Sequence, residues 1–303
     1  MIDTDIQPRN ANPARLDDHQ TLTPEADANV PGLRVITPSD GLLSVDWREI
    51  WRFRDLLLLL TMRDINVRYK QAVFGVGWAV LQPLATMLVF WMFFGRLGGI
   101  DHRTGSTPYA VYVLAGLLPW TFFATSLTNC STALVGSYNL ITKVYFPRLI
   151  IPMSTVFACL FDLAVSMLLL AVVMVGYHLR PTGSIVGSLV ALVGMVAAAT
   201  GIGSALAALT VEYRDIRYVT PFVVQIWMFI TPVIYPASMV PHKWQWLYSM
   251  NPMVGLVDAF RCGLLGQAIP WERLTISIAA SIVLFLVGAT YFRAVERRFA
   301  DVI

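Results

Sequence analysis

The chain has 303 residues, of which 56% are hydrophobic and only 14% are charged, and its formal net charge is +3. A soluble domain of this size is usually about 45–50% apolar and about a quarter charged. This composition would leave large apolar patches facing water unless lipid covered them. The charge is too small to indicate a nucleic-acid partner, and it suits the Lys and Arg excess that membrane proteins keep on their cytoplasmic side. We therefore expect an all-α polytopic membrane protein surrounded by membrane lipids.

Residues 1–40 are rich in Asp, Pro, Arg, Asn and Thr. Their low apolar content predicts a disordered cytoplasmic tail. No apolar core typical of a secretory signal is visible there, so we expect the membrane signals to be internal.

Region 41–72 contains an amphipathic pattern over residues 45–62. One side of a helix there can hold Trp47, Ile50, Trp51 and the leucines of 56–60, with Arg48, Glu49, Arg52 and Asp55 opposite. A basic, Trp-bearing helix of this kind lies in the membrane interface rather than crossing the bilayer. The region therefore predicts an N-terminal interface helix.

Six apolar stretches predict transmembrane helices, because about 20 apolar residues cross a bilayer. They cover residues 73–94, 109–134, 152–177, 184–210, 219–235 and 274–292. Before the last of them, region 237–270 contains several prolines and tryptophans and only short apolar pieces, such as 253–260. Such pieces are typical of re-entrant helices.

The distribution of Lys and Arg predicts the orientation. With both termini inside, thirteen lie near the cytoplasmic face: Arg48, Arg52, Arg54, Arg63, Arg68, Lys70, Lys143, Arg148, Arg214, Arg217, Arg293, Arg297 and Arg298. Six lie outside: Arg96, Arg103, Arg180, Lys243, Arg261 and Arg273. This excess indicates cytoplasmic termini, which agrees with an even number of spans.

Small residues and cysteines give weaker signals. Ala197, Gly201 and Ala205 recur at four-residue spacing in the fourth predicted span. This spacing either lets two helix backbones approach closely or only fills a crowded bundle. Cys130, Cys159 and Cys262 lack metal-binding spacing, and we expect them to be buried as small hydrophobic residues.

Catalytic motifs are absent from the sequence. It has no G-x-x-x-x-G-K-[ST] phosphate loop, no H-E-x-x-H and no G-x-S-x-G, so we expect no bound cofactor or metal and no ATP hydrolysis by that route. The four histidines all lie in tails or loops.

Two acidic residues lie in apolar sequence, where a carboxylate is costly and marks a function by default. Asp258 has Arg261 three residues further on, and a local helical ion pair explains it. Asp162 has no local partner in sequence. It could couple protons, line a wet cavity or bond a neighbouring helix.

Four polar segments on the predicted cytoplasmic side combine charges with aromatic residues or proline. They are 63–70, 143–148, 212–217 and 293–303. Membrane anchoring would explain their Arg and Lys, but the embedded Tyr, Phe and Pro indicate docking to a partner surface.

These segments carry a family resemblance. The chain resembles the permease of an ABC-2-type exporter, in the O-antigen, teichoic acid and capsule polysaccharide branch. The matching stretches are Arg63-Asp-Ile-Asn-Val-Arg-Tyr-Lys-Gln-Ala-Val-Phe-Gly-Val-Gly-Trp78, Gln82-Pro83, Lys143-Val-Tyr-Phe-Pro-Arg-Leu-Ile-Ile-Pro152, Glu212-Tyr-Arg-Asp215, Thr231-Pro-Val-Ile-Tyr-Pro236, Asn251-Pro-Met253 and Glu296-Arg-Arg-Phe-Ala-Asp-Val-Ile303. The polar N-terminus departs from the family pattern.

The resemblance implies an ABC-2-type transmembrane domain over 73–303 in a bacterial inner membrane. Such permeases form homodimers, pair with two nucleotide-binding subunits that hold ATP and Mg²⁺, and export a polyprenyl-linked polysaccharide of O-antigen, galactan or teichoic acid type. By this resemblance, residues 137–149 would form the segment that couples to the ATPase. Its docking residues would be Lys143, Tyr145, Phe146, Pro147 and Arg148, with Phe146 as the apolar anchor buried only in the complex.

Two other functions remain open on the sequence. A membrane-embedded transferase of lipid-linked sugars would share the aromatic residues and the basic cytoplasmic face, but it should show a catalytic carboxylate cluster or a loop histidine. An ABC-2 drug exporter would share the architecture but usually lacks the Phe-Pro-Arg and Phe-Ala-Asp pieces.

Overall fold

The computed structural model describes residues 47–70, 74–100, 107–179 and 185–296. The chain divides into residues 1–41 and 42–303, and all the described residues belong to the second unit. The predicted disordered tail lies outside the described residues, as does the end of the chain after Glu296. The described residues form helices and no strand, as predicted.

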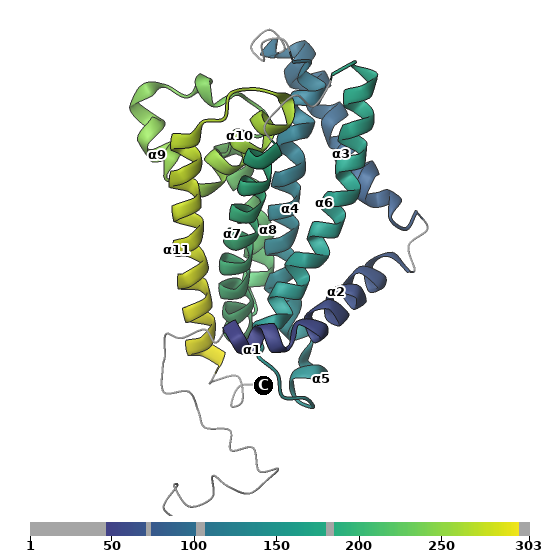
Figure 1. Ribbon diagram of the computed structural model, residues 1–303, viewed down its shortest axis with the longest axis vertical. Coiled ribbons are helices and arrows are strands. Elements are labelled where there is room, and N and C mark those ends of the chain that lie inside the picture. Colours follow the sequence, from purple (N-terminus) through teal and green to yellow (C-terminus); the bar gives the residue numbers. More distant parts are fainter. Residues whose placement is uncertain (1–46, 71–73, 101–106, 180–184, 297–303) are drawn as a thin grey trace, which may run out of the picture. The chain divides into compact units, whose positions relative to one another are not determined.

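Five helices are long and apolar enough to cross a membrane. They are α3 (Gly77–Phe90) continued by the π-helix η1 (Trp91–Leu97), α4 (Tyr109–Gly136), α6 (Ile150–Gly176), α7 (Ile185–Glu212) and α11 (Trp271–Glu296). They match five of the six predicted spans, with boundaries that differ by a few residues. Figure 1 shows that the axes of α4, α6, α7 and α11 all run roughly along the length of the bundle.

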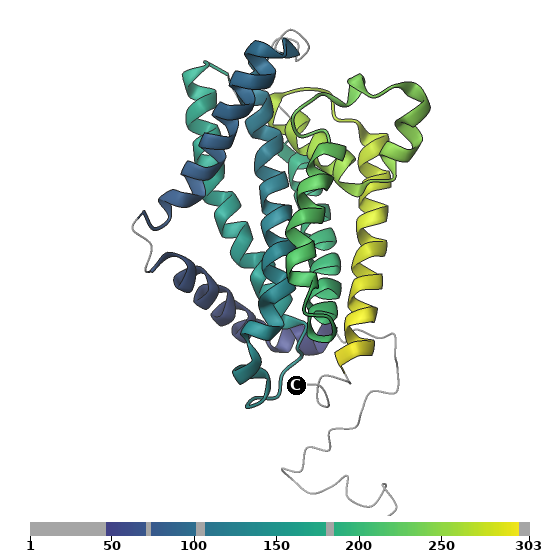
Figure 2. The same cartoon turned by 180° about the vertical axis from the view of Figure 1, so that it is seen from behind.

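The sixth predicted span, 219–235, is not confirmed. Its helix, α8 (Ile216–Ile230), has 15 residues, fewer than the roughly 17–25 that a transmembrane helix needs. The helix ends because Pro232 disfavours the helical conformation of the residue before it, and Thr231 is extended, with φ −100° and ψ 142°. Helix α8 packs against α4 and α7, and Figure 2 shows it from its outer side, in front of those helices.

Helix α4 lies at the centre of the bundle. It packs against α3, α6, α7, α8 and α10, and most of its residues are buried. In contrast, only Pro83 and Met87 of α3 are buried. Its main contacts among the described helices are with α4, α6 and η1. Cys130, Cys159 and Cys262 are all buried, as predicted.

The amphipathic interface helix predicted over 45–62 is not confirmed. The region forms two helices, α1 (Trp47–Arg52) and α2 (Arg54–Tyr69). Leu60 and Thr61 are buried, whereas Leu58, Leu59 and Met62 are exposed, so α2 has no single apolar face turned to the bundle. Helix α2 packs against α6 and slopes along its side in Figure 1.

The predicted re-entrant region, 237–270, forms short helices at the opposite end of the bundle from α1 and α5 (Tyr138–Ile141) (Figure 1). They are η3 (Ala237–Met239), η4 (His242–Trp244), α9 (Gln245–Ser249) and α10 (Pro252–Leu265). Helix α10 has 14 residues and is too short to cross a bilayer. It is nearly fully buried against α4, α7 and α11.

The Asn251-Pro252-Met253 segment fixes the start of α10. The Asn251 side chain accepts a hydrogen bond from the Met253 amide at 3.0 Å, and Pro252 opens the helix, where its missing N–H costs nothing. Asn251 also accepts from Trp227 Nε1 at 3.0 Å and donates to Thr231 Oγ1 at 3.1 Å. This side chain therefore ties α10 to the end of α8.

Candidate functional site

The segment between α4 and α6 lies at the end of the bundle near α1. Only α5 is helical in the predicted coupling segment 137–149, and bends and turns connect it to α6. The side chains of Lys143, Val144 and Tyr145 are exposed, with Tyr145 at 70%, and Pro147 is half-buried. The segment therefore presents its residues 142–145 on the surface.

The prediction that Phe146 is an anchor left free for a partner is wrong. Phe146 is 4% exposed, in a buried cluster formed with Ile50, Leu60, Leu134, Leu149, Ile150, Ile151, Ala207, Ala208 and Phe292. These residues come from α1, α2, α4, α6, α7 and α11, so the ring packs where the helices converge. The sequence could not show this, because an apolar ring beside Pro147 suits either a partner or the chain's own core.

Arg148 holds the same segment to the last helix. Its backbone N–H donates to Glu296 Oε1 at 3.3 Å, and its Nη1 donates to the Glu296 carbonyl at 3.1 Å. Phe146 and Arg148 thus fix the inner side of the segment, while Lys143 and Tyr145 point to the surface. These contacts tie the segment to α11 and to the buried cluster around Phe146.

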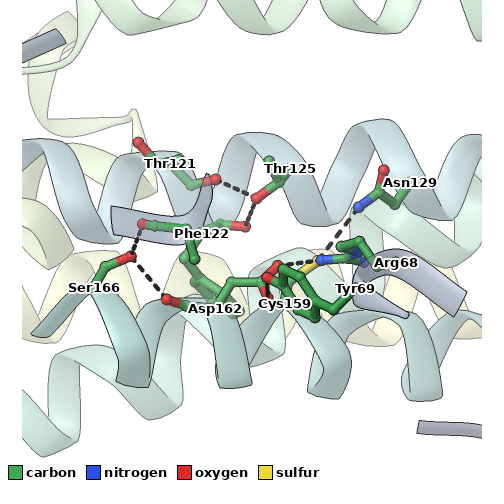
Figure 3. Close-up of polar contacts among 10 residues, drawn as sticks. Arg68, Tyr69, Thr121, Phe122, Thr125, Asn129, Cys159, Asp162 and Ser166 are labelled. Carbon is green, nitrogen blue, oxygen red and sulfur yellow. Dashed lines mark hydrogen bonds and ion pairs between the residues drawn. The ribbon is translucent and has the colours of Figure 1, made fainter. Parts of the chain in front are cut away.

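Asp162 lies near the middle of α6, about 18 Å along the helix from its first residue. Its carboxylate accepts hydrogen bonds from Arg68 and Tyr69 at the end of α2 (Figure 3). This pairing was not predicted, because Arg68 was placed only among the cytoplasmic charges and Asp162 has no partner near it in sequence. Burial and the bond to Asp162 raise the pKa of Tyr69, so its hydroxyl stays protonated and donates.

A cavity of about 440 Å³ with mixed polar and apolar walls surrounds this pair, between α2, α3, α4 and α6. Its walls are formed by Arg68, Tyr69, Gly75, Trp78, Ala79, Gln82, Pro83, Leu118, Thr121, Phe122, Thr125, Asn129, Cys159, Asp162, Leu163 and Ser166. The Thr125 hydroxyl donates to carbonyls of its own helix, at Thr121 and Phe122. Asn129 Nδ2 lies 3.6 Å from the Cys159 sulfur. Of the possible roles of Asp162, the structure shows a bond to a neighbouring helix and a place in a cavity wall.

Pro83 explains one contact in this cavity. A proline inside a helix removes the hydrogen bond to the carbonyl four residues earlier, here that of Ala79. Ser166 Oγ of α6 lies 2.7 Å from that carbonyl and 2.8 Å from the Asp162 carbonyl. A span with a free carbonyl is tolerated when a neighbouring helix supplies a donor, and Ser166 does so.

Asp258 and Arg261 form the predicted local ion pair, with Arg261 Nη2 2.8 Å from Asp258 Oδ1. Arg261 is fully buried. It also donates to the Pro232 carbonyl at 3.0 Å and lies 4.0 Å above the Tyr112 ring. Arg273 Nη1 of α11 is 3.7 Å from the other oxygen of Asp258. The pair therefore links α4, α10, α11 and the residues after α8.

A larger hollow, of about 840 Å³, lies between α7, α8 and α11 and has almost wholly apolar walls. It offers a ligand few polar contacts. The cavity around Asp162, whose walls hold more polar groups, is therefore the better candidate for a site that binds a hydrophilic ligand.

Comparison with known proteins shows the family of the chain. The ABC-2 type transporter family matches residues 55–265. An O-antigen export system permease, RfbA, of Myxococcus xanthus is 29% identical over 84% of this chain and 97% of its own length. RfbA of Klebsiella pneumoniae is 27% identical, over 82% and 95%. The polysialic acid transport protein KpsM of Escherichia coli is 26% identical, over 78% and 92%. The chain belongs to the ABC-2 type transporter family, as its sequence motifs indicated.

Proposed function

We propose that this chain is the membrane-spanning permease of an exporter that moves a lipid-linked polysaccharide across the bacterial cytoplasmic membrane. The polymer would be of O-antigen, galactan or teichoic acid type, carried on a polyprenyl lipid. A separate nucleotide-binding subunit binds ATP and Mg²⁺ and supplies the energy, and two copies of the chain form the pathway. The relatives named for O-antigen export and polysialic acid transport support the substrate class.

The observation that carries the proposal is the segment 142–148, fixed inside by Phe146 and Arg148 and exposed outside at Lys143 and Tyr145. An ATPase that changes shape must hold a stiff part of the permease to move its helices. Tyrosine is common among the residues that dominate protein interfaces, and a lysine beside it steers association. Tyr145 therefore takes the anchoring role that the sequence assigned to Phe146.

We expect Tyr145→Ala to weaken binding of the ATPase. Truncating a central anchor typically costs about 2 kcal/mol or more, roughly thirtyfold in affinity. The measurement is co-purification of the ATPase with the tagged permease, together with export of polymer to the cell surface. Tyr177→Ala is the matched control, because Tyr177 is also exposed but lies at the other end of α6. Phe146→Ala would test folding rather than docking.

Normal co-purification and normal export by Tyr145→Ala would contradict the docking role of this segment. If the control variant lost the ATPase equally, the effect would report general damage to the permease.

The orientation gives a further test. Val144, which follows α5, is 51% exposed, and Trp246, in α9, is 67% exposed. Helices α5 and α9 lie at opposite ends of the bundle (Figure 1). The three native cysteines are buried, so they give a low background. We expect a membrane-impermeant maleimide to label Trp246→Cys in intact cells and Val144→Cys only in opened cells. The reverse pattern would contradict cytoplasmic termini.

A further inference from the structure

The walls of the cavity around Asp162 combine two kinds of surface. Trp78 offers an aromatic ring that is 49% exposed, and Phe122 and Tyr69 add two more rings. Between the rings lie hydroxyl, amide and carboxylate groups, among them Gln82 and Thr125. The volume of about 440 Å³ lies within the roughly 300–1,000 Å³ of small-molecule sites. Mixed walls of this kind suit a ligand that has apolar faces and polar edges.

The charges in the walls balance each other. Arg68 and Asp162 are the two charged lining residues, and they are paired. An inorganic anion would have to compete with Asp162 for Arg68, and a cation would have to compete with Arg68 for Asp162. The walls therefore favour an uncharged ligand.

Several polar atoms keep the capacity to bond such a ligand. Because the Thr125 hydroxyl donates to its own helix, its oxygen can still accept. Asn129 has a carbonyl oxygen besides the amide that faces Cys159. Each oxygen of Asp162 accepts one bond and has a second lone pair. Gln82 is exposed on α3 and has both a donor and an acceptor. The cavity can thus serve hydroxyl groups at several points of a ring.

We propose that this cavity binds one sugar ring of a glycan, with a ring face against Trp78 and its hydroxyls bonded by Gln82, Thr125 and Asn129. Arg68 holds the carboxylate of Asp162, a further hydrogen-bond acceptor for the ring, in place. The inference rests on the proposed function in one respect, which is that the ring belongs to the exported polysaccharide. A glycolipid of the surrounding membrane has the same chemistry and is the alternative source.

The test uses the permease–ATPase complex in lipid nanodiscs prepared without glycosidic detergent. The probes are methyl β-D-glucopyranoside, methyl α-D-mannopyranoside and N-acetylglucosamine, with glycerol as an acyclic polyol. We expect saturation-transfer NMR to show contact between the protein and at least one sugar but not glycerol. In Gln82→Leu/Thr125→Val, the loss of two hydrogen bonds should lower affinity about tenfold.

Thr128→Val is the matched control, because Thr128 makes the same bond to its own helix, to the Ala124 carbonyl at 2.9 Å, but does not line the cavity. It should bind the sugars as the wild type does. Lack of transfer to all three sugars in the wild type, or equal transfer in the double variant, would overturn the proposal.

Export of polymer by cells separates the two sources of the ring. Slower export by the double variant, with normal export by Thr128→Val, supports the exported glycan. Normal export by a double variant that has lost sugar binding overturns that assignment. Failure of the proposed function looks different, because the wild-type complex itself would then not export polymer.

Discussion

Arg261→Met is expected to cause a large loss of stability in the permease. Methionine replaces the aliphatic part of the arginine but has no charge, so Asp258, 13% exposed, would keep Arg273, at 3.7 Å, as its basic partner among the described residues. The Pro232 carbonyl would also lose its donor. Removing one partner of a buried ion pair typically costs about 3–5 kcal/mol. The measurement is the midpoint of thermal unfolding of the purified permease, followed by the fraction that remains monodisperse.

Two further variants separate charge from packing. Arg261→Lys keeps the charge but cannot reach Asp258 and the Pro232 carbonyl together, so we expect an intermediate loss. Adding Asp258→Leu to Arg261→Met removes the unpaired carboxylate, and Arg273 is 37% exposed, so water can solvate it. The double variant should therefore be more stable than Arg261→Met alone. A double variant less stable than the single one would show that the pair does not act as a unit.

The sequence predicted the features that depend on local pattern. Five spans were found within a few residues because length and apolar content alone define them. The pair of Asp258 and Arg261 was found because three residues separate the two on one helix. The span predicted over 219–235 was not confirmed for a local reason as well, since Pro232 and its extended neighbour Thr231 end the helix inside an apolar stretch.

The candidate site could not be predicted in the same way. Arg68 and Asp162 are 94 residues apart, and only the packing of α2 on α6 brings them together. The rule that an intramembrane carboxylate needs a partner could have narrowed the search to the basic residues of segment 63–70. Phe146 shows the opposite limit, because its residue type fits both a core and an interface, and only its burial in the folded chain decides between them.

A substitution where α7 and α11 cross should cause the second large loss of stability. Gly201 and Gly288 face each other there, and a Cβ on Gly288 would lie 1.9 Å from the Gly201 carbonyl oxygen. A Cβ on Gly201 would lie 2.4 Å from Phe285 Cα. The small residues of the fourth predicted span therefore do allow close backbone approach. Because these atoms belong to the backbone, no side-chain rotation can relieve the overlap.

We expect Gly288→Ala to force the two helices apart and to cost about 3 kcal/mol, the upper end of the range for overpacking. Unfolding of the purified permease on heating would then occur at a lower temperature. Gly176→Ala is the matched control, because it is also helical and a Cβ there meets no atom within 4 Å. It should be neutral or stabilise the fold by up to about 1 kcal/mol. Equal stability of Gly288→Ala and the wild type would mean that α7 and α11 do not cross at these glycines.

Under the proposed function, we expect the distance between α7 and α11 to affect transport as well as stability. Helix α11 ends at Glu296, which Arg148 binds beside the exposed segment 142–145. If the ATPase docks on that segment as proposed, its movement would reach α11 through Arg148 and α7 through the tight contact at Gly288. We expect Gly288→Ala to export polymer more slowly while the ATPase still co-purifies with it. Export at the wild-type rate by a Gly288→Ala permease of lowered stability would show that the crossing serves the fold alone.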